Sequence, residues 1–305
     1  MQATPLNIST MTISGHLGAI PDLKKLYTNC SFIPYWWVGE GIIKIQLNDE
    51  QKGICTEDIL HHTSKLKKRF FNQSTLVFRL QRSENHWKEV NIKLFKNGGF
   101  QMTGISSTDM ARAALTQLIA SNKDRDIWPS EPYIKDFHVC MMNSDFSINK
   151  AIRRDRLYRV LVEEYGLTCS YEPTVYQGVN TKFFWNKQRP GSAPPGICAC
   201  PNPCAGDGGG YGVGQCKKIT ISPFRTGRII ITGAECEEQL QDAYVFINDV
   251  FRRFADQVLR DELEAETAPV PKKKTNTPTT SEGIIRQKMR ASPRNVVRMV
   301  AVNAA

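Results

Sequence analysis

The chain contains one stretch twice, and this duplication constrains the fold more than any other feature of the sequence. Residues 92–105 read I-K-L-F-K-N-G-G-F-Q-M-T-G-I, and residues 221–234 read I-S-P-F-R-T-G-R-I-I-I-T-G-A. Aligned without a gap, the copies share Phe95 with Phe224, Gly98 with Gly227, and Thr103-Gly104 with Thr232-Gly233. A stretch that recurs in this way indicates a repeated structural unit.

A second pattern, C-S-aromatic-x-P-x-x-aromatic, precedes each copy. It covers residues 30–37, ending at Trp37, and residues 169–176, ending at Tyr176. Two patterns in the same order, with only the connecting length changed, indicate a duplicated unit at roughly residues 6–125 and 132–262. We therefore divide the chain into a first repeat at 1–130, a second repeat at 131–262 and a basic tail at 263–305 that is expected to be disordered.

Each unit is expected to consist of a strand, a helix, several antiparallel strands and a final helix. In the first unit, Asp22 is expected to cap the first helix, strands are predicted at 42–47, 75–80, 90–95 and 100–103, and the last helix should end at Ala120. In the second unit, Ser147 is expected to cap a helix that Gly166 ends. A polar and basic insertion falls at about 48–73, and a Cys/Gly/Pro-rich insertion falls at 186–215.

Two such units joined edge to edge predict an α+β fold with one continuous curved antiparallel sheet. The helices would cover one, convex face of this sheet and leave the other face bare. A bare sheet face of that size indicates a binding surface.

This layout resembles the TATA-box-binding protein family, most closely its divergent members from large nucleocytoplasmic DNA viruses. The resemblance rests on Asp22-Leu23-Lys24-Lys25-Leu26, on the Tyr171-Glu172-Pro173 turn, and on F-x-x-G-[KR]-x-x-x-T-G-A at 224–234. It implies a saddle of two repeats that binds and bends AT-rich promoter DNA through the minor groove, as a general transcription factor that nucleates initiation.

The resemblance also implies four aromatic wedges, which push between base steps and kink the duplex. By position in the repeated patterns these are Trp37, Phe95, Tyr176 and Phe224. The family usually has phenylalanine where this chain has Trp37 and Tyr176, so the kink geometry is expected to differ. A shift of one residue along the strand would present Trp36 instead of Trp37. Ordinary burial of all four rings in the core is the competing interpretation.

Other positions are matched to the groove floor and to the phosphates. Thr103 and Thr232 match floor positions, where a hydroxyl can contact the acceptors of A·T pairs, although β-propensity alone also explains them. Gly99 stands where the second copy has a basic residue, so the two halves are expected to grip DNA unequally. The implied phosphate contacts, with Lys44 aligned to Lys182, are Lys44, Lys96, Lys182, Arg225 and Arg228.

A partner surface is implied at the turn that contains Glu172, Thr174 and Val175. It aligns with the turn on which the family docks a transcription factor IIB-like protein, and RNA polymerase is the further expected partner. Thr174 replaces the second acidic residue of the family here, so this turn has one of the two acidic side chains that the family offers its partner.

Four of the nine cysteines crowd the second insertion, in the spacing C-x-C-x3-C-x11-C. Cys198, Cys200, Cys204 and Cys216 could bind a structural zinc ion, because four thiolates satisfy its tetrahedral coordination. The spacing is not a paired C-x-x-C, so reduced thiols without metal are the alternative. No other cofactor is expected.

Charge and motif content limit the remaining functions. Residues 268–305 carry +7 of the net charge of +10, with eight basic residues against Glu282 alone, so charge alone does not identify a nucleic-acid binder. No catalytic or metal spacing joins the five histidines, and an enzyme is not expected. No long apolar run or signal pattern is present, which predicts an intracellular protein. The resemblance implies the host nucleus or a viral factory as its location.

Two further functions fit the same fold. The first is a scaffold or virion protein that has lost DNA bending, which a bare face poor in accessible basic residues would favour. The second is a module that grips damaged or RNA–DNA hybrid duplex, which a preference for such duplexes over AT-rich DNA would favour.

Overall fold

The computed structural model describes residues 1–60, 71–84 and 86–261. One compact unit, Met1–Glu262, contains both repeats. The predicted basic tail and the central part of the first insertion, with Lys65, Lys67, Lys68 and Arg69, lie outside the described residues.

The first repeat follows the predicted order with two added elements. Its elements are β1 (Asn7–His16), α1 (Leu23–Asn29), β2 (Gly41–Leu47), β3 (Glu50–Gly53), α2 (Thr56–Leu60), β4 (Gln73–Ser83), β5 (His86–Phe95), β6 (Gly99–Ile105) and α3 (Thr108–Ala120). The strand β3 and the short helix α2 belong to the polar insertion.

The second repeat has the same order without an equivalent of β3 and α2. Its elements are β7 (Lys135–Ser147), β8 (Ala151–Ile152), α4 (Arg154–Glu163), β9 (Thr168–Glu172), β10 (Tyr176–Trp185), β11 (Lys217–Pro223), β12 (Arg228–Ala234), α5 (Glu237–Arg253), α6 (Ala255–Val258) and β13 (Leu259–Arg260). The strands β8 and β13 form a small separate pair.

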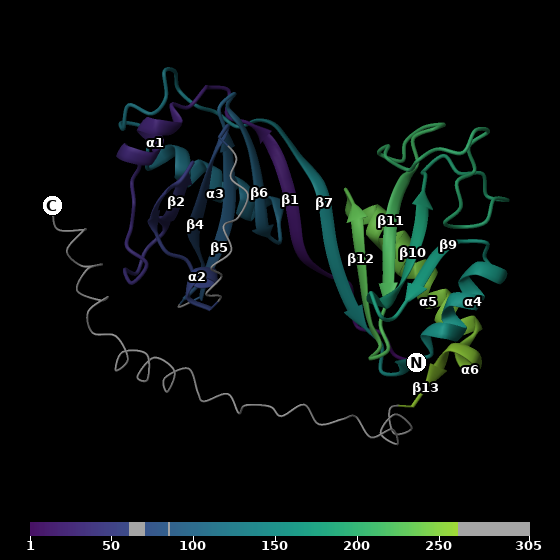
Figure 1. Ribbon diagram of the computed structural model, residues 1–305. Coiled ribbons are helices and arrows are strands. Elements are labelled where there is room, and N and C mark those ends of the chain that lie inside the picture. Colours follow the sequence, from purple (N-terminus) through teal and green to yellow (C-terminus); the bar gives the residue numbers. More distant parts are fainter. Residues whose placement is uncertain (61–70, 85, 262–305) are drawn as a thin grey trace, which may run out of the picture. The chain divides into compact units, whose positions relative to one another are not determined.

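Eleven strands form one antiparallel sheet in the order β3-β2-β4-β5-β6-β1-β7-β12-β11-β10-β9. The strands β1 and β7 pair with each other and join the repeats (Figure 1). From β1 outward the neighbours are β6, β5, β4 and β2, and from β7 outward they are β12, β11, β10 and β9. The expected α+β fold of two tandem repeats sharing one antiparallel sheet is therefore confirmed.

The two faces of this sheet differ in burial. In β6, Phe100 and Met102 are buried beneath α3, and in β12, Ile229 and Ile231 are buried beneath α5. The alternate side chains, among them Thr103, are only half-buried, because no long helix covers them. We call this second side the open face.

Local sequence signals explain some of the helix ends. Asp22 accepts hydrogen bonds from the amides of Lys24 and Lys25 at 2.9 and 3.0 Å, which confirms the predicted cap of α1. Gly166, at φ +67°, ends the turn after α4 as expected. The predicted cap at Ser147 is wrong, because that residue ends β7 and the helix begins only at Arg154.

The short helix α2 departs from the expectation that every helix lies on one face. Asp58 of α2 binds Lys44, whose side chain lies on the open face of β2, in the same row of the sheet as Thr103.

Among the described residues, no helix is long and apolar enough to cross a membrane.

Candidate nucleic-acid interface and four-cysteine cluster

Two aromatic rings pack together at one end of the second repeat. Tyr176 begins β10, and Phe224 directly follows β11. Their ring centroids are 5.6 Å apart with an interplanar angle of 69°. Both rings lie over Gly178, where a Cβ atom would come within 2.9 Å of Tyr176 and 3.2 Å of Phe224. Tyr176 remains 42% exposed, so the pair forms part of the surface and is not ordinary core.

The turn after Phe95 in the first repeat has the geometry of the turn after Phe224. The Gly98 amide donates to the Phe95 carbonyl at 2.9 Å, and the Gly227 amide donates to the Phe224 carbonyl at 3.0 Å. The two glycines have φ of +87° and +81°, a conformation that favours glycine. The structure thus places Phe95 and Phe224 at equivalent positions, as their alignment predicted.

Trp37 does not lie beside Phe95, contrary to the alignment of the C-S-aromatic patterns. Its loop is held by the buried Arg79, whose guanidinium donates to the carbonyls of Tyr35, Trp37 and Gly39. Phe95 pairs with Gln73, six residues from Arg79 along β4, which is roughly 20 Å at the rise of an extended strand. Trp37 is 62% exposed at the opposite end of the sheet, and its neighbour Trp36 is 72% exposed.

The structural counterpart of Tyr176 is Phe71. Val77 of β4 lies opposite Asn91, which lies opposite Thr103. In the second repeat Lys182 of β10 occupies the same place, opposite Thr220 and then Thr232. Phe71 stands six residues before Val77, and Tyr176 stands six residues before Lys182. The two aromatics therefore occupy equivalent positions.

Phe71 is 73% exposed and adjoins the Phe95 turn, because the Asn72 carbonyl accepts from the Lys96 amide at 3.0 Å. The repeated pattern did not reveal this residue, since the polar insertion separates it from its C-S-aromatic block. The available signal was an aromatic two residues before the alternating strand at 73–83.

The two threonines matched to the groove floor occupy equivalent places on the open face. Thr103 pairs with Asn91, and Thr232 pairs with Thr220 and with Asn143 of the central strand β7. All five side chains are half-buried and polar. A row of hydroxyl and amide groups therefore crosses the middle of the sheet.

The basic residues of the second repeat differ in their availability. Lys182 lies on the open face, where its Nζ donates to Thr220 Oγ1 at 3.0 Å. Burial, and then the neighbouring charge of Lys218, lower the pKa of Lys182. Arg225 is exposed, whereas Arg228 pairs with Asp145 at 2.9 Å. In the first repeat, Lys96 is exposed beside the Phe95 turn.

Lys44 is neither equivalent to Lys182 nor free. It stands on β2, one strand further from the centre, because β4 with Val77 takes the place of β10. Its Nζ lies 2.6 Å from Asp58 Oδ1, and its side chain is only 15% exposed. Burial opposes ionisation of Asp58, but the bonds from Lys44 and Cys55 outweigh it and lower the pKa of the carboxyl.

The residues around this pair form a second small core on the open face. Cys55 packs against Ile43 and Val77, and the Thr56 hydroxyl donates to Glu89 Oε1 at 2.6 Å. We call residues 53–60 the cover segment, because they lie over the outer part of the open face of the first repeat. The described part of the second repeat has no counterpart of it.

The turn proposed as a partner surface is a tight connection between β9 and β10. The Val175 amide donates to the Glu172 carbonyl at 3.0 Å, and the Thr174 hydroxyl donates to Glu172 Oε1, also at 3.0 Å. Val175 is 84% exposed. The turn is therefore accessible, and its docking role stays a prediction.

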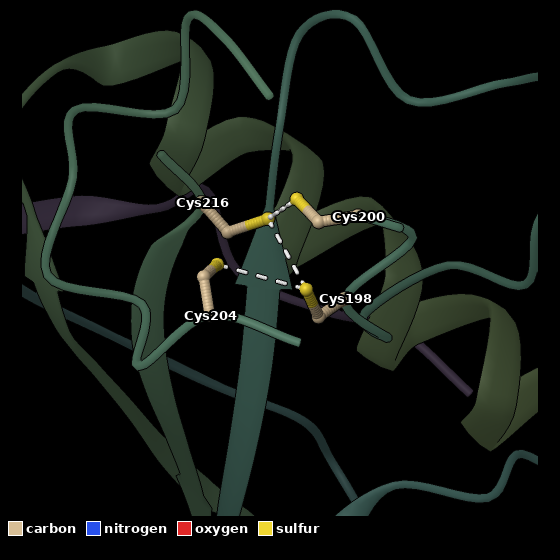
Figure 2. A group of neighbouring side chains, drawn as sticks. All are labelled: Cys198, Cys200, Cys204 and Cys216. Carbon is tan, nitrogen blue, oxygen red and sulfur yellow. Dashed lines mark hydrogen bonds between the residues drawn. The ribbon is translucent and has the colours of Figure 1, made fainter. Parts of the chain in front are cut away.

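The four cysteines of the second insertion converge on one point (Figure 2). Their sulfur atoms all lie within 4.8 Å of one another. The closest pairs are Cys200 with Cys216 at 3.5 Å, Cys198 with Cys204 at 3.6 Å and Cys198 with Cys216 at 3.8 Å. These separations are far longer than the 2.05 Å or so of a disulfide, and all four thiols are free.

The surroundings of the cluster affect the individual thiols differently. The Gly214 amide donates to Cys200 Sγ at 3.1 Å. Hydrogen bonds from the backbone of Cys204, and then that of Cys200, lower the pKa of Cys198 to about 6. Burial raises the pKa of Cys216 to about 12. The group is a partly buried set of four sulfur donors.

No protein-family model matches the chain. A TATA-box-binding protein-like protein of Acanthamoeba polyphaga mimivirus is 26% identical over 268 residues, which is 83% of this chain and 66% of that relative. The chain thus spans just under two thirds of the length of the relative. A TBP of Methanococcus jannaschii is similar in structure, with a TM-score of 0.46 and 17% identity over 82% of this chain and 99% of that one. The similarity to the mimivirus relative confirms the resemblance to the TATA-box-binding protein family that the repeated motifs indicated.

Proposed function

We propose that this protein binds AT-rich double-stranded DNA on its open face, enters the minor groove and bends the duplex with aromatic wedges. In this proposal it acts without catalysis, as a promoter-recognition factor that nucleates transcription initiation. The similarity to a TATA-box-binding protein-like relative supports DNA binding as the general function.

The observation that carries the proposal is the placement of two aromatic positions at the same end of each repeat. Tyr176 and Phe224 form a partly exposed pair, and Phe71 and Phe95 occupy the equivalent positions. Minor-groove proteins that kink DNA insert apolar side chains between base steps and offset the unstacking cost by wrapping more protein surface. Phe71 thus replaces Trp37 in the set of wedges that the sequence suggested.

The open face between the two pairs suits a minor-groove floor. Thr103 and Thr232 offer hydroxyls close to the centre of the sheet, where the acceptors of A·T pairs can be contacted. Lys96 and Arg225 are exposed at the two aromatic turns, which is where phosphates on either side of a kink would lie. Lys182 donates to Thr220, which pairs with Thr232 of the floor.

The decisive experiment measures energy transfer between dyes at the two ends of an AT-rich duplex. The wild-type chain is compared with Phe95→Ala/Phe224→Ala at two salt concentrations, and Trp37→Ala serves as the matched control. We expect the wild type and Trp37→Ala to bend the duplex and the double variant to bind without bending. Weak, steeply salt-dependent binding without a bend in the wild type would overturn the proposal.

Further expectations from the resemblance belong to the same proposal. A transcription factor IIB-like protein would dock on the turn of Glu172, Thr174 and Val175, and RNA polymerase would follow. The site of action would be the host nucleus or a viral factory. A pull-down of the factor IIB-like protein with wild type and Val175→Glu tests the docking turn.

One specific observation favours a second candidate function, a scaffold that does not bend DNA. Among the described residues, Lys44 pairs with Asp58, Arg228 pairs with Asp145, and Gly99 carries no charge, so these three positions give the open face fewer unpaired basic residues than the resemblance implies. The energy-transfer experiment separates the two functions. Including an RNA–DNA hybrid duplex in the same series tests a third, the gripping of hybrid duplexes.

The four-cysteine cluster lies at the opposite end of β10 and β11 from the Tyr176 and Phe224 pair. A structural zinc ion there is a proposal separate from DNA bending.

A further inference from the structure

The four cysteines connect the second insertion to the sheet. Cys198, Cys200 and Cys204 lie within the insertion, whereas Cys216 immediately precedes β11. A ligand shared by all four sulfur atoms would therefore fix the loop against the start of that strand.

The residues directly after Cys204 contact the open face. The Gly206 carbonyl accepts from the Lys218 amide at 2.8 Å, and the Ala205 carbonyl accepts from Lys218 Nζ, also at 2.8 Å. Asp207 forms a bridge with Lys217. Gly206 has φ +80°, and a Cβ atom there would lie 2.6 Å from Lys218. This short segment therefore pairs locally with the start of β11 and holds the Lys218 side chain. Lys218 Nζ also lies 3.6 Å from Asp207 Oδ1 in a solvent-exposed pair, which is weak enough for a phosphate to replace.

We propose that the four thiolates bind one zinc ion, and that this ion, by ordering residues 205–207, fixes Lys218 at the outer end of the open face. The metal site itself is independent of the proposed function. The consequence for Lys218 rests on that function, because it matters only if the open face binds DNA.

The geometry of the sulfur atoms carries the metal assignment. A tetrahedral site with Zn–S bonds of about 2.3 Å places its sulfur atoms about 3.8 Å apart. The closest pairs here are separated by 3.5, 3.6 and 3.8 Å. A polynuclear iron–sulfur cluster separates its thiolates more widely, because bridging sulfides and several irons lie between them.

Hydrogen bonds to the sulfur atoms add a second, independent observation. The Gly214 amide donates to Cys200 Sγ at 3.1 Å, and Asn186 Nδ2 donates to Cys216 Sγ at 3.5 Å. Such outer contacts orient metal ligands and favour the charged thiolate. Binding would exchange the thiol protons for the metal, releasing them to solvent.

The metal part is tested on the full chain purified without added metal. Elemental analysis and replacement by Co(II), whose tetrahedral thiolate complexes absorb in the visible, should both report one ion per chain. Cys204→Ser should lower the affinity for the metal at least tenfold. Cys236→Ser is the matched control, because that cysteine lies outside the cluster at the N-cap of α5, where serine is well tolerated.

The absence of stoichiometric zinc, the presence of iron instead, or a chain mass that shows two disulfides would each overturn the zinc assignment. These readouts do not involve DNA. A chain that binds zinc but not DNA would therefore refute the proposed function and leave the metal site standing.

The consequence for Lys218 is tested by the salt dependence of DNA binding. Removal of the metal from the wild type should reduce the slope of log K against log[salt] by about one, the contribution of one phosphate contact. Lys218→Met should give the same reduction while it retains zinc, which keeps the test valid if Cys204→Ser does not fold. A slope unchanged in both the metal-free wild type and Lys218→Met would refute the coupling.

Discussion

The two repeats share a fold but present different open faces. Both have the same strand order and the same glycine turn after Phe95 and Phe224. The insertion of the first repeat places the cover segment over the row that ends in Lys44, whereas the insertion of the second repeat leaves Lys182 in place on the open face and orders Lys218. Duplication therefore preserved the core and the turns, while the insertions changed the surface available to a ligand.

Burial explains why the cover segment is a stable part of the first repeat. Cys55 and Val77 are 3% and 5% exposed, although Val77 points to the side of the sheet without long helices. Lys44 and Asp58 satisfy each other's charges in a half-buried place, where separating them would leave a costly unpaired group. DNA on the open face would thus meet a narrower surface in the first repeat.

The largest expected effect comes from removing the aromatic pairs one repeat at a time. Tyr176→Ala/Phe224→Ala should weaken binding by about 2–6 kcal/mol and abolish the kink on that side, because each aromatic–base contact contributes about 1–3 kcal/mol. Phe71→Ala/Phe95→Ala should weaken DNA binding by less, because the cover segment limits the approach of DNA to the first repeat. Titration of a dye-labelled duplex measures both the affinity and the remaining bend.

Equal losses from the two double variants would show that the cover segment does not restrict the first repeat. Circular dichroism of each variant provides the control for folding, because Phe224 and Phe95 are half-buried.

The elements that could be predicted are those whose signals are local. The strands at 42–47, 75–80, 90–95 and 100–103 were placed within a few residues of β2, β4, β5 and β6, because alternation and turn glycines lie within each segment. The cap at Asp22 and the helix stop at Gly166 depend on neighbouring residues in the same way. The tetrad of cysteines was likewise visible from its spacing.

The positions of Trp37, Lys44 and Phe71 could not be predicted, because they depend on how the first insertion and its neighbouring strands pair within the sheet. The C-S-aromatic patterns align Trp37 with Tyr176, but in the first repeat the chain after Trp37 forms β2 and β3 before β4 takes the position of β10. Spacing along the chain therefore stopped matching position in the sheet. The same displacement equated Lys44 with Lys182 and hid Phe71, and no local signal reports that Asp58 neutralises Lys44.

The next effect concerns stability and tests whether the turns are equivalent. Gly98→Ala and Gly227→Ala should each destabilise the protein by about 2–4 kcal/mol, because a positive φ strains alanine. The added Cβ would also lie 2.3 Å from the Ala19 carbonyl in one case and 2.4 Å from the Lys150 carbonyl in the other. Urea denaturation measures the loss in the free energy of unfolding.

Gly99→Ala is the matched control for this turn. Gly99 does not have a positive φ, and the nearest atom to its Cβ position is the flexible Asn97 side chain at 3.1 Å. Gly99→Ala should lower the free energy of unfolding by less than about 1 kcal/mol. A large loss at only one of Gly98 and Gly227 would contradict the equivalence of the repeats.

A smaller effect decides which aromatic pairs with Phe95. Phe71→Ala should reduce bending and weaken DNA binding by about 1–3 kcal/mol, as expected for one aromatic–base contact. Trp37→Ala and Trp36→Ala should leave both unchanged, because their loop lies at the far end of the sheet, held by Arg79. The opposite result would restore the pairing that the repeated sequence patterns suggest.

The smallest effect compares two lysines that the sequence equates and the structure separates. Lys182→Met should lower the slope of log K against log[salt] by about 0.9, because one phosphate contact is lost. Lys44→Met should leave the slope unchanged, since Asp58 already neutralises its charge at 2.6 Å. It should lower the melting temperature, because the partly buried Asp58 carboxylate would lose its cation. If Lys44→Met lowers the slope as much as Lys182→Met does, Asp58 must release Lys44 when DNA binds. The cover segment would then be a displaceable element, and the two repeats would grip the duplex alike.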